Sequence, residues 1–362
     1  MSQIQLGLDT FGDVTADADG RPLSHAHVLR HVLAEAELAD RLGVDFFGVG
    51  EHHRPDFAIS APEVLLAAIA GRTERIRLGT AVTVLSTDDP VRVYQRFSTL
   101  DAVSNGRAEV ILGRGSFTES FPLFGYSLDD YDRLFEEKLA IFAALRDADR
   151  TDKPVRWKGT VRPPLDGLRV YPPVERQPLS TWVGVGGSPE SVVRAARYGF
   201  PLTLAIIGGD PRRFAPYIEL YHEALAQHGS PRLPVGVHSP GHIADTDVQA
   251  REELWPAYEV MRNRIGAERG WGPTSRAEFD REVAVGSLYV GAPETVARKI
   301  AATVRALGAS RFDLKYSAGT LPHETMMRSI ERYGREVIPR VQRLLAESVS
   351  QETGQGTAAA GR

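Results

Sequence analysis

A short apolar run followed by a helical stretch recurs along this 362-residue chain, and this repeat constrains the fold more than any other feature. Eight main runs have the length and composition of β-strands, and each is followed by a helix. The runs are 4–10, 45–51, 76–84, 107–113, 181–185, 201–207, 234–238 and 311–317. Nearly unbroken apolar strands that alternate with helices are typical of a parallel sheet covered by those helices.

The boundaries of the predicted helices support the repeat. Pro62, Pro90 and Pro293 each stand at a helix start, where a missing backbone N–H is tolerated. Gly43 ends the first helix, 25–42. Eight strand–helix units favour a closed barrel over an open doubly wound sheet, which more often has about five to seven strands. We therefore predict an α/β fold, a (β/α)₈ TIM barrel with inserted segments.

Two stretches interrupt the repeat. Residues 150–180 contain six prolines and predict an inserted hairpin and loop, whereas 266–286 are predicted to be irregular. No linker separates two halves of different composition. We predict a single domain over 1–349, with insertions near 150–180 and 266–286, and a disordered tail of small polar residues at 350–362.

Composition excludes several classes of function. The formal net charge of −4 gives no electrostatic case for a nucleic-acid partner. No apolar run approaches the roughly 18 residues of a membrane span. The absence of cysteine excludes disulfides, thiolate catalysis and cysteine–zinc sites. The N-terminus lacks the features of a signal peptide, and we expect a cytoplasmic protein.

In a parallel barrel the loops after the strands gather at one rim, where sites are built. Glu51, His52 and His53 follow the second strand. This group could bind a metal, transfer protons, form hydrogen bonds or be purely structural. A metal would need a further ligand, and adjacent side chains on an extended chain point in opposite directions. We favour proton or hydrogen-bond chemistry for His52 and His53, and we predict no metal site.

Arg114, Gly115 and Ser116 follow the fourth strand. Glycine permits close backbone approach, and arginine can bind a phosphate through two hydrogen bonds. A tight turn that carries a surface arginine is the alternative interpretation of this segment alone.

Gly186, Gly187 and Ser188 lead from the fifth strand into a helix that Pro189 opens. The free amides at such a helix start bind anions, and Ser191 lies on the same turn as the capping Ser188. A capped helix without a ligand is the alternative. The arginine on the neighbouring loop favours a phosphorylated cofactor.

Small residues in the third strand, among them Thr80, Ala81 and Val82, would let a flat ring lie against the barrel wall. Small residues also fill barrel interiors, so this signal is weak by itself.

Taken together, these segments make the sequence resemble the bacterial-luciferase-like family of flavin-dependent monooxygenases. The resemblance is carried by GEHHRPDFAISAP, RIRLGTAVTVLSTDDPVRVYQRFSTLD and SNGRAEVILGRGSF, and later by VGVGGSPESVVRAARYG at 183–199 and LYVGAPETVARKI at 288–300. It implies a barrel with an inserted segment, reduced FMN as cosubstrate and usually a homodimer. It also implies that O₂ is used to oxygenate a small organic substrate. No dinucleotide fingerprint follows the first strand, which points to a separate flavin reductase.

The resemblance also suggests roles for individual residues. His52 is similar to the family's catalytic histidine, with His53 beside it. The Ala81–Val82 bond resembles the family's cis peptide behind the flavin ring. Arg114 and the backbone near Ser116 resemble a phosphate clamp, which Ser188 and Ser191 join.

The sequence departs from luciferase itself at two positions. Gly113 stands where luciferase has a reactive cysteine, and Gly187 where it has an acidic residue. The resemblance therefore supports the broader oxidoreductase family rather than light emission. Three alternatives stay open: a reductase that uses a deazaflavin coenzyme, a flavin-binding protein without catalysis and, last, a metal-dependent hydrolase.

Overall fold

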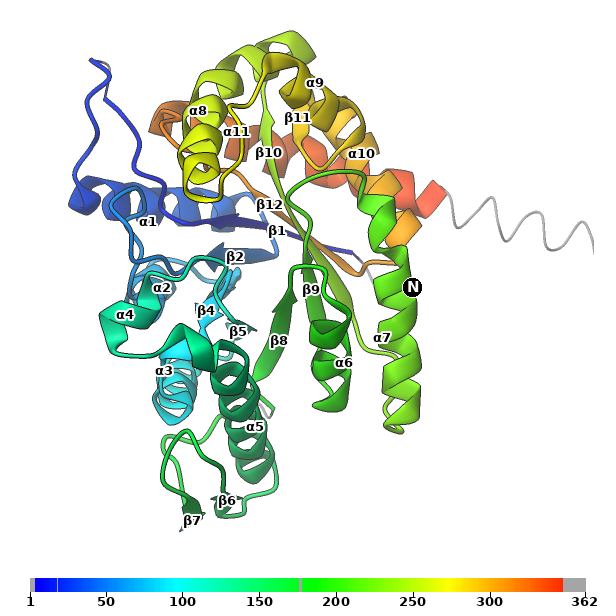
Figure 1. The fold of residues 1–362 in the computed structure, drawn as a ribbon. Helices are drawn as coiled ribbons and strands as arrows, with labels where there is room; N and C mark the ends of the chain where they lie inside the picture. The colour runs from blue at the N-terminus through cyan, green and yellow to red at the C-terminus, as the bar shows by residue number, and fades with distance from the viewer. Residues whose placement is uncertain (1–3, 18, 176–177, 348–362) are drawn as a thin grey trace, which may run out of the picture.

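The structure is a computed structural model that describes residues 4–17, 19–175 and 178–347. Within these ranges the chain forms a barrel of parallel strands surrounded by helices (Figure 1). The predicted polar tail at 350–362 lies outside the described residues.

The barrel closes through eight strands. They are β1 (Gln5–Thr10), β2 (Phe46–Val49), β3 (Arg77–Thr80), β5 (Ala108–Gly113), β8 (Ser180–Val185), β9 (Leu202–Ala205), β10 (Val235–Ile243) and β12 (Arg311–Lys315). Each strand pairs in parallel with the next, and β12 pairs with β1. The prediction of a closed barrel rather than an open sheet is confirmed.

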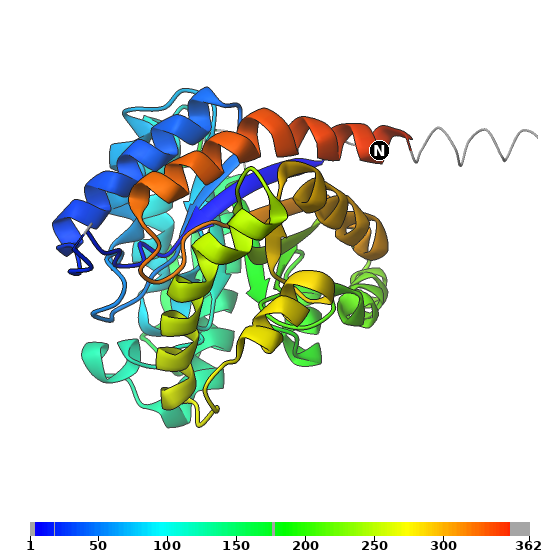
Figure 2. The ribbon, with the colours of Figure 1, turned by 90° about the horizontal axis from the view of Figure 1, so that it is seen from above.

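Helices cover the outside of the barrel, and Figure 2 shows α1 beside the C-terminal helices. They are α1 (His25–Arg41), α2 (Pro62–Ala70), α3 (Pro90–Val103), α5 (Tyr131–Arg150), α6 (Pro189–Arg197), α7 (Ala215–Gln227), α10 (Pro293–Leu307) and α11 (His323–Arg332). Short turns of 3₁₀ or π-helix add η1 (Leu85–Thr87), η2 (Leu128–Asp130), η3 (Pro211–Phe214) and η4 (Tyr333–Val337). Proline opens α2, α3, α6 and α10, as predicted. Among the described residues, no helix is both long enough and apolar enough to cross a lipid bilayer.

The third strand is interrupted near its carboxyl end. The sequence predicted one strand over 76–84, but β3 ends at Thr80 and a separate β4 (Thr83–Val84) pairs with β5. The Ala81–Val82 peptide bond between them is cis, as the resemblance implied.

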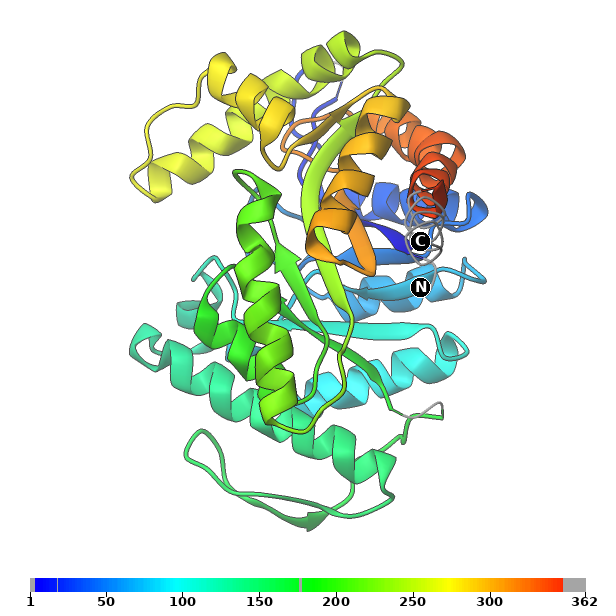
Figure 3. The same ribbon diagram turned by 90° about the vertical axis from the view of Figure 1, so that its right-hand side faces the viewer.

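The two inserted regions lie at opposite ends of the molecule (Figures 1 and 3). In the first, β6 (Val155–Trp157) and β7 (Leu165–Leu168) form the predicted antiparallel hairpin. A short helix, α4 (Ser120–Phe124), lies in the loop after β5. A further strand, β11 (Tyr289–Gly291), pairs with the far end of β10, outside the barrel.

The prediction that 266–286 are irregular is wrong. Helix α8 (Asp247–Glu268) extends into this region, and α9 (Arg276–Val285) occupies its second half. The local cause is a capping box, in which the Ser275 hydroxyl accepts from the Glu278 amide while the Glu278 carboxylate accepts from the Ser275 amide. This signal was present in the sequence.

An ion-pair cluster closes the barrel interior at the amino ends of the strands. Arg311 is fully buried, is ion-paired with Glu109 and Asp313, and stacks 3.5 Å from the centre of the Phe46 ring. Buried charges are tolerated when paired in this way. The cluster gives the opposite, carboxyl end of the barrel a closed floor.

Candidate active site

The carboxyl ends of the strands surround a cavity of about 240 Å³, at the rim where barrel sites are built. We call it the barrel cavity. Its lining residues are Asp9, Phe11, Glu51, His52, His53, Ala81, Val82, Val84, Ile111, Gly113, Arg114, Gly115, Ser116, Phe117, Glu119, Ser120, Tyr131, Gly184, Val185, Gly186, Ser191, Thr203, Ala205, His238 and Asp313. The loops after β2, β5 and β8, which carry candidate residues, therefore meet there as predicted, and Phe11 from the loop after β1 joins them.

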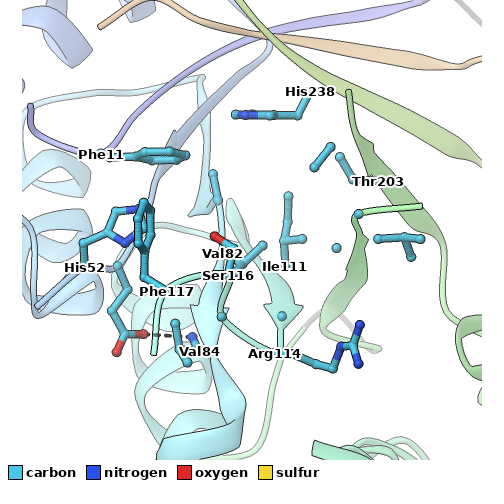
Figure 4. A pocket seen from close by; sticks show the side chains of 18 of the residues that line it. Phe11, His52, Val82, Val84, Ile111, Arg114, Ser116, Phe117, Thr203 and His238 are labelled. Atoms are coloured by element: carbon cyan, nitrogen blue, oxygen red, sulfur yellow. Dashed lines mark hydrogen bonds between the residues drawn. The ribbon is translucent and has the colours of Figure 1, made fainter. Parts of the chain in front are cut away.

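His52 lies on one wall of the barrel cavity, among aromatic rings (Figure 4). The centres of the Phe11, Phe57 and Phe117 rings lie 4.9, 4.5 and 5.0 Å from the centre of its imidazole. Its Nδ1 is 3.8 Å from Glu119 Oε1. An imidazole held in apolar surroundings beside one carboxylate can hold or move a proton.

His53 is held differently from its neighbour. Its Nε2 lies 2.8 Å from Glu51 Oε1, and the other oxygen of Glu51 accepts a hydrogen bond of 2.9 Å from the Val84 amide. The His53 ring meets the Phe124 ring edge-on, with 5.0 Å between their centres. Glu51 thus ties the loop after β2 to β4, and His53 is oriented by a carboxylate rather than caged by aromatic rings.

Glu119 is a site residue that the sequence analysis missed, because 117–130 contain no motif that predicts a role. Its Oε1 also accepts a hydrogen bond from the His53 amide, at 3.4 Å. Burial by itself would raise the pKa of Glu119, but the nearby His52 ring and this amide outweigh burial and lower the pKa. The cavity therefore holds a carboxylate that stays ionised beside His52.

Arg114 lies on the opposite side of the barrel cavity from the aromatic wall (Figure 4). Its guanidinium donates to Asp132 Oδ1 at 2.8 Å and stacks 5.3 Å from the centre of the Tyr131 ring. Tyr131 in turn donates to the Gly115 carbonyl at 2.7 Å, which fixes this loop. Gly115 has a φ of +83°, which glycine adopts without strain. Ser116 also lines the cavity.

The start of α6 faces the same cavity. Ser188 is the N-cap, and its hydroxyl accepts from the Ser191 amide at 3.3 Å and donates to the Ser191 hydroxyl at 2.9 Å. Gly186 and Ser191 line the cavity, whereas Gly187 and Ser188 lie outside its lining. The Arg194 guanidinium donates to the Ser191 hydroxyl at 3.4 Å, one turn further along. The structure thus brings Ser191 to the side of Arg114, with Ser188 behind it.

Val82 occupies the mouth of the barrel, and glycines make room for it. A Cβ at Gly113 would overlap Val82 Cγ2, and a Cβ at Gly184 would lie 2.9 Å from Val82 Cγ1. Ala81 and Val82 line the cavity. Thr80 does not, because its hydroxyl is hydrogen-bonded to the backbone of β5 at 3.2 Å.

A third histidine, His238, lines the cavity beyond Phe11 (Figure 4). Its Nδ1 lies 2.7 Å from Asp9 Oδ2, and its ring stacks 6.0 Å from that of Phe11. Burial alone would lower the pKa of His238, but the Asp9 carboxylate outweighs burial and raises it. The sequence analysis overlooked both residues, although each stands near the carboxyl end of a predicted strand. Within the described chain, no group of three or more histidine or acidic side chains is placed to hold a metal ion.

A profile of the luciferase-like monooxygenase family matches residues 10–311. The chain belongs to this family. 4-Hydroxyprotoasukamycin monooxygenase from Streptomyces nodosus subsp. asukaensis is 29% identical over 317 residues, which cover 84% of this chain and 85% of the relative. The alkanal monooxygenase alpha chain from Photobacterium leiognathi is 29% identical over 241 residues, which cover 66% of this chain and 65% of the relative. The chain spans between half and two thirds of the length of the first curated relatives it matches.

Solved structures share the fold of this luciferase-like protein. Monooxygenase RslO1 from Streptomyces bottropensis superposes with a TM-score of 0.81 at 24% identity, covering 93% of this chain and 99% of that one. The oxygenating constituent of 3,6-diketocamphane monooxygenase from Pseudomonas putida, in complex with FMN, gives 0.74 at 19% identity, with coverage of 94% and 99%. An F420-dependent secondary alcohol dehydrogenase, in complex with an F420–acetone adduct, gives 0.73 at 19% identity, with the same coverage.

A larger cavity of about 500 Å³ adjoins the barrel cavity in this luciferase-like protein. We call it the helical chamber, because α8 and α9 form much of its wall. Its lining residues are Phe11, Phe57, Ser116, Phe117, Ile207, Gly208, Arg213, Pro240, Gly241, Leu254, Tyr258, Met261, Arg262, Ile265, Arg269, Trp271, Thr274, Glu278, Arg281, Glu282, Leu288, Lys315, Ser317 and Ala318. Phe11, Ser116 and Phe117 line both cavities.

Proposed function

We propose that this luciferase-like protein is an FMN-dependent monooxygenase that uses reduced FMN and O₂ to oxygenate a small organic substrate. The observation that carries the proposal is the composition of the barrel cavity. Arg114 and the start of α6 lie on one side of it, and His52 lies in an aromatic wall on another. The Arg114 side would bind the anionic tail of such a cofactor, and the aromatic wall would contact its flat ring.

The residues on the Arg114 side suit a phosphate. Arg114 supplies a charged donor, and the free amides at the start of α6 add the positive end of a helix dipole. The present partner of Arg114, Asp132, has a side chain that is 75% exposed, and exposed ion pairs are weak. A dianionic phosphate would therefore displace Asp132, and the Ser191 hydroxyl would donate beside it.

The opposite side suits a ring system that must be kept from water. When bound, reduced FMN supplies the activation of O₂ and the transfer of one oxygen atom to the substrate. Phe11, Phe57 and Phe117 exclude water from the His52 imidazole. His52 would hold a proton at its ring nitrogen for donation during oxygen transfer, and the ionised Glu119 would orient the ring and stabilise its charged form.

Two further pairs would support the same chemistry. Glu51 fixes the His53 ring, and Asp9 fixes the His238 ring on the other side of Phe11. Asp9 Oδ1 is buried and has no hydrogen-bond partner among the described residues, so it is available to a polar group of a ligand. We also infer that a separate reductase supplies the reduced FMN and that the protein is a homodimer, as the family resemblance implies.

Anaerobic titration followed by mixing with O₂ tests this function. The protein is titrated with reduced FMN and, separately, with reduced deazaflavin coenzyme, and cofactor oxidation and H₂O₂ release are then recorded. We expect reduced FMN to bind and its oxidation to follow a time course different from that of free FMN. Preference for the deazaflavin, with FMN oxidation unchanged, would indicate a hydride-transferring reductase. Binding of FMN without any effect on its oxidation would indicate a flavin-binding protein without catalysis.

A further inference from the structure

The helical chamber combines apolar walls with an excess of positive charge. The apolar part of the lining includes Phe57, Leu254, Met261, Ile265, Trp271 and Leu288. Its charged side chains are five cations, Arg213, Arg262, Arg269, Arg281 and Lys315, and two acids, Glu278 and Glu282. A cavity with this composition suits an apolar molecule that carries a negative charge.

The two acidic side chains of the chamber are engaged by backbone amides. Glu282 accepts hydrogen bonds from the Gly209 amide at 2.9 Å and from the Ser287 amide at 3.1 Å. Glu278 accepts from the Ser275 amide at 2.8 Å, as part of the capping box of α9. These carboxylates hold the wall of the chamber together, and within the described chain neither forms an ion pair with an arginine of the lining.

The cations of the chamber differ in whether they are paired with another group of the protein. Lys315 is paired with Asp13 at 3.0 Å, and Arg269 donates to the Ser116 carbonyl at 3.2 Å. Arg213, Arg262 and Arg281 form no ion pair with any described residue. Arg213 and Arg281 are exposed, whereas Arg262 is half-buried in the wall. Of these three arginines, Arg262 is therefore the one whose charge water neutralises least.

The side chain of Arg262 is positioned as an anchor. Its guanidinium carbon lies 4.1 Å from the centre of the Trp271 ring, which fixes the plane of the group. Its Nη1 is buried and has no hydrogen-bond partner among the described residues. A buried charged donor without an acceptor is costly, so a ligand that accepts hydrogen bonds from this guanidinium would stabilise it.

We propose that the helical chamber binds a small organic anion, a carboxylate or sulfonate on an apolar body, with Arg262 as its anchor. This inference rests on the proposed function, because it identifies the anion as the class of substrate to be oxygenated. Arg262 lines the chamber, and its planar guanidinium suits recognition of an oxyanion by two parallel hydrogen bonds. The apolar body covers Trp271 and the aliphatic side chains of α8.

The chamber also places such an anion beside the proposed chemistry. Phe11 and Phe117 line both cavities, and the His52 ring packs against both of them. The two ends of the anion would therefore have different surroundings. Arg262 holds the charged end, and the apolar end lies near the rings that surround His52.

Binding without turnover tests the inference, with 2-naphthoate as the probe and uncharged 2-naphthamide as its isostere. Both are titrated by calorimetry into the flavin-free protein, and 2-naphthalenesulfonate is added as a second anion. We expect 2-naphthoate to bind at least about tenfold more tightly than 2-naphthamide, the value of one charge-assisted hydrogen bond. Arg262→Met should remove this preference without weakening the amide.

Arg264→Met is the matched control, because Arg264 lies on the same helix, outside the chamber, at 3.6 Å from Asp56. It should keep the preference for the anion. Equal binding of acid and amide by the wild type, no binding of either anion, or an unchanged preference in Arg262→Met would each overturn the inference. The comparison of acid and amide binding to the wild type tests the inference even if a variant fails to fold.

A parallel titration with reduced FMN separates this inference from the proposed function. If FMN binds and the anions do not, the proposed substrate class is wrong, whereas the proposed cofactor is retained. If the anions bind and FMN does not, the anion site is retained and the proposed FMN-dependent function is wrong.

Discussion

The barrel cavity and the helical chamber share three residues of their linings but are built from different parts of the fold. Strand ends, glycine turns and the first turn of α6 form the barrel cavity. Side chains of α8, α9 and their connection form much of the helical chamber. Their charges also differ. The barrel cavity has four acids, Asp9, Glu51, Glu119 and Asp313, and one arginine, Arg114, whereas arginines outnumber acids in the chamber.

This contrast separates the site that the barrel forms, the barrel cavity, from the site that the added helices form, the helical chamber. The backbone positions in the barrel cavity follow from strand pairing, so the proposed cofactor site depends on the fold itself. The chamber wall depends on side chains of helices outside the barrel, which can change without altering any strand. We infer that the substrate preference of this protein was set by the region between β10 and β12.

The largest expected effect is at the junction of the two cavities. We expect His52→Ala to lower the rate of oxygen transfer by about 10²–10⁴-fold, the usual contribution of a positioned acid or base. Binding of reduced FMN and of 2-naphthoate should persist, because neither proposed anchor is touched. His228→Ala, at the exposed C-cap of α7, is the control. Unaltered turnover in His52→Ala would remove this histidine from the mechanism.

A substitution at a strand end tests whether backbone shape builds the barrel cavity. Gly113→Ala should lower the free energy of unfolding by about 1–3 kcal/mol, because the new Cβ overlaps Val82 in a packed interior. Gly186→Ala is matched to it, since a Cβ there meets no atom within 4 Å. Urea denaturation without ligand measures both. Equal stability of the two variants would contradict the close packing around Val82.

The wall of the helical chamber should respond to alkaline pH through Lys299. Its ammonium donates to three carbonyls, those of Glu282, Val283 and Leu288, and burial lowers the pKa of Lys299 to about 8. The pKa of a lysine in the unfolded chain is about 10.4. Between the two pKa values the unfolded state therefore binds more protons than the folded state. The contribution of Lys299 to the free energy of unfolding therefore rises with pH, by at most about 1.4 kcal/mol per pH unit.

The change in slope between variants isolates this contribution. Lys299→Met should reduce the slope of the free energy of unfolding against pH between about pH 8 and 10. Lys158→Met, at an exposed lysine of the inserted hairpin region, should leave this slope as in the wild type. Denaturation midpoints across this pH range measure it. An identical slope in wild type and Lys299→Met would show that Lys299 titrates as it does in the unfolded chain.

The smallest expected effect concerns the helix start beside Arg114. Ser188→Ala should lower the free energy of unfolding by about 1 kcal/mol, because it removes the N-cap of α6. Binding of reduced FMN should weaken only a few-fold, since Ser188 lies behind the cavity and acts by holding the first turn. Thermal melts and anaerobic titrations measure the two effects. A loss of FMN affinity with no loss of stability would instead indicate direct contact.

The sequence predicted the barrel cavity better than the chamber for a physical reason. Apolar strands, proline at helix starts and glycine turns are local signals, and strand ends converge by topology. The sequence therefore predicted that Arg114, Ser191 and His52 lie at one rim, and all three line the barrel cavity. His238 obeys the same rule and was overlooked. The contact of Glu119 with His52 and the close packing of Val82 against Gly113 join segments distant in the sequence, so no local pattern predicts them.

The helical chamber required the structure. The capping box at Ser275 could have revealed α9, but how α8 and α9 pack on the barrel depends on contacts between distant segments. Trp271 lies in the connection between α8 and α9 and lines the chamber. Arg262 carries no motif, and its stacking on Trp271 in the chamber wall became visible only in the structure.

Riboflavin lacks the phosphate of FMN, so it tests most directly whether Arg114 binds that phosphate. Reduced FMN and reduced riboflavin are titrated anaerobically into the wild type, Arg114→Ala and Arg298→Ala, the last at an exposed arginine of α10. We predict that Arg114→Ala weakens FMN binding by about 1.5–3 kcal/mol and leaves riboflavin unchanged, while Arg298→Ala alters neither. Equal losses for FMN and riboflavin, or no loss for FMN, would contradict the account.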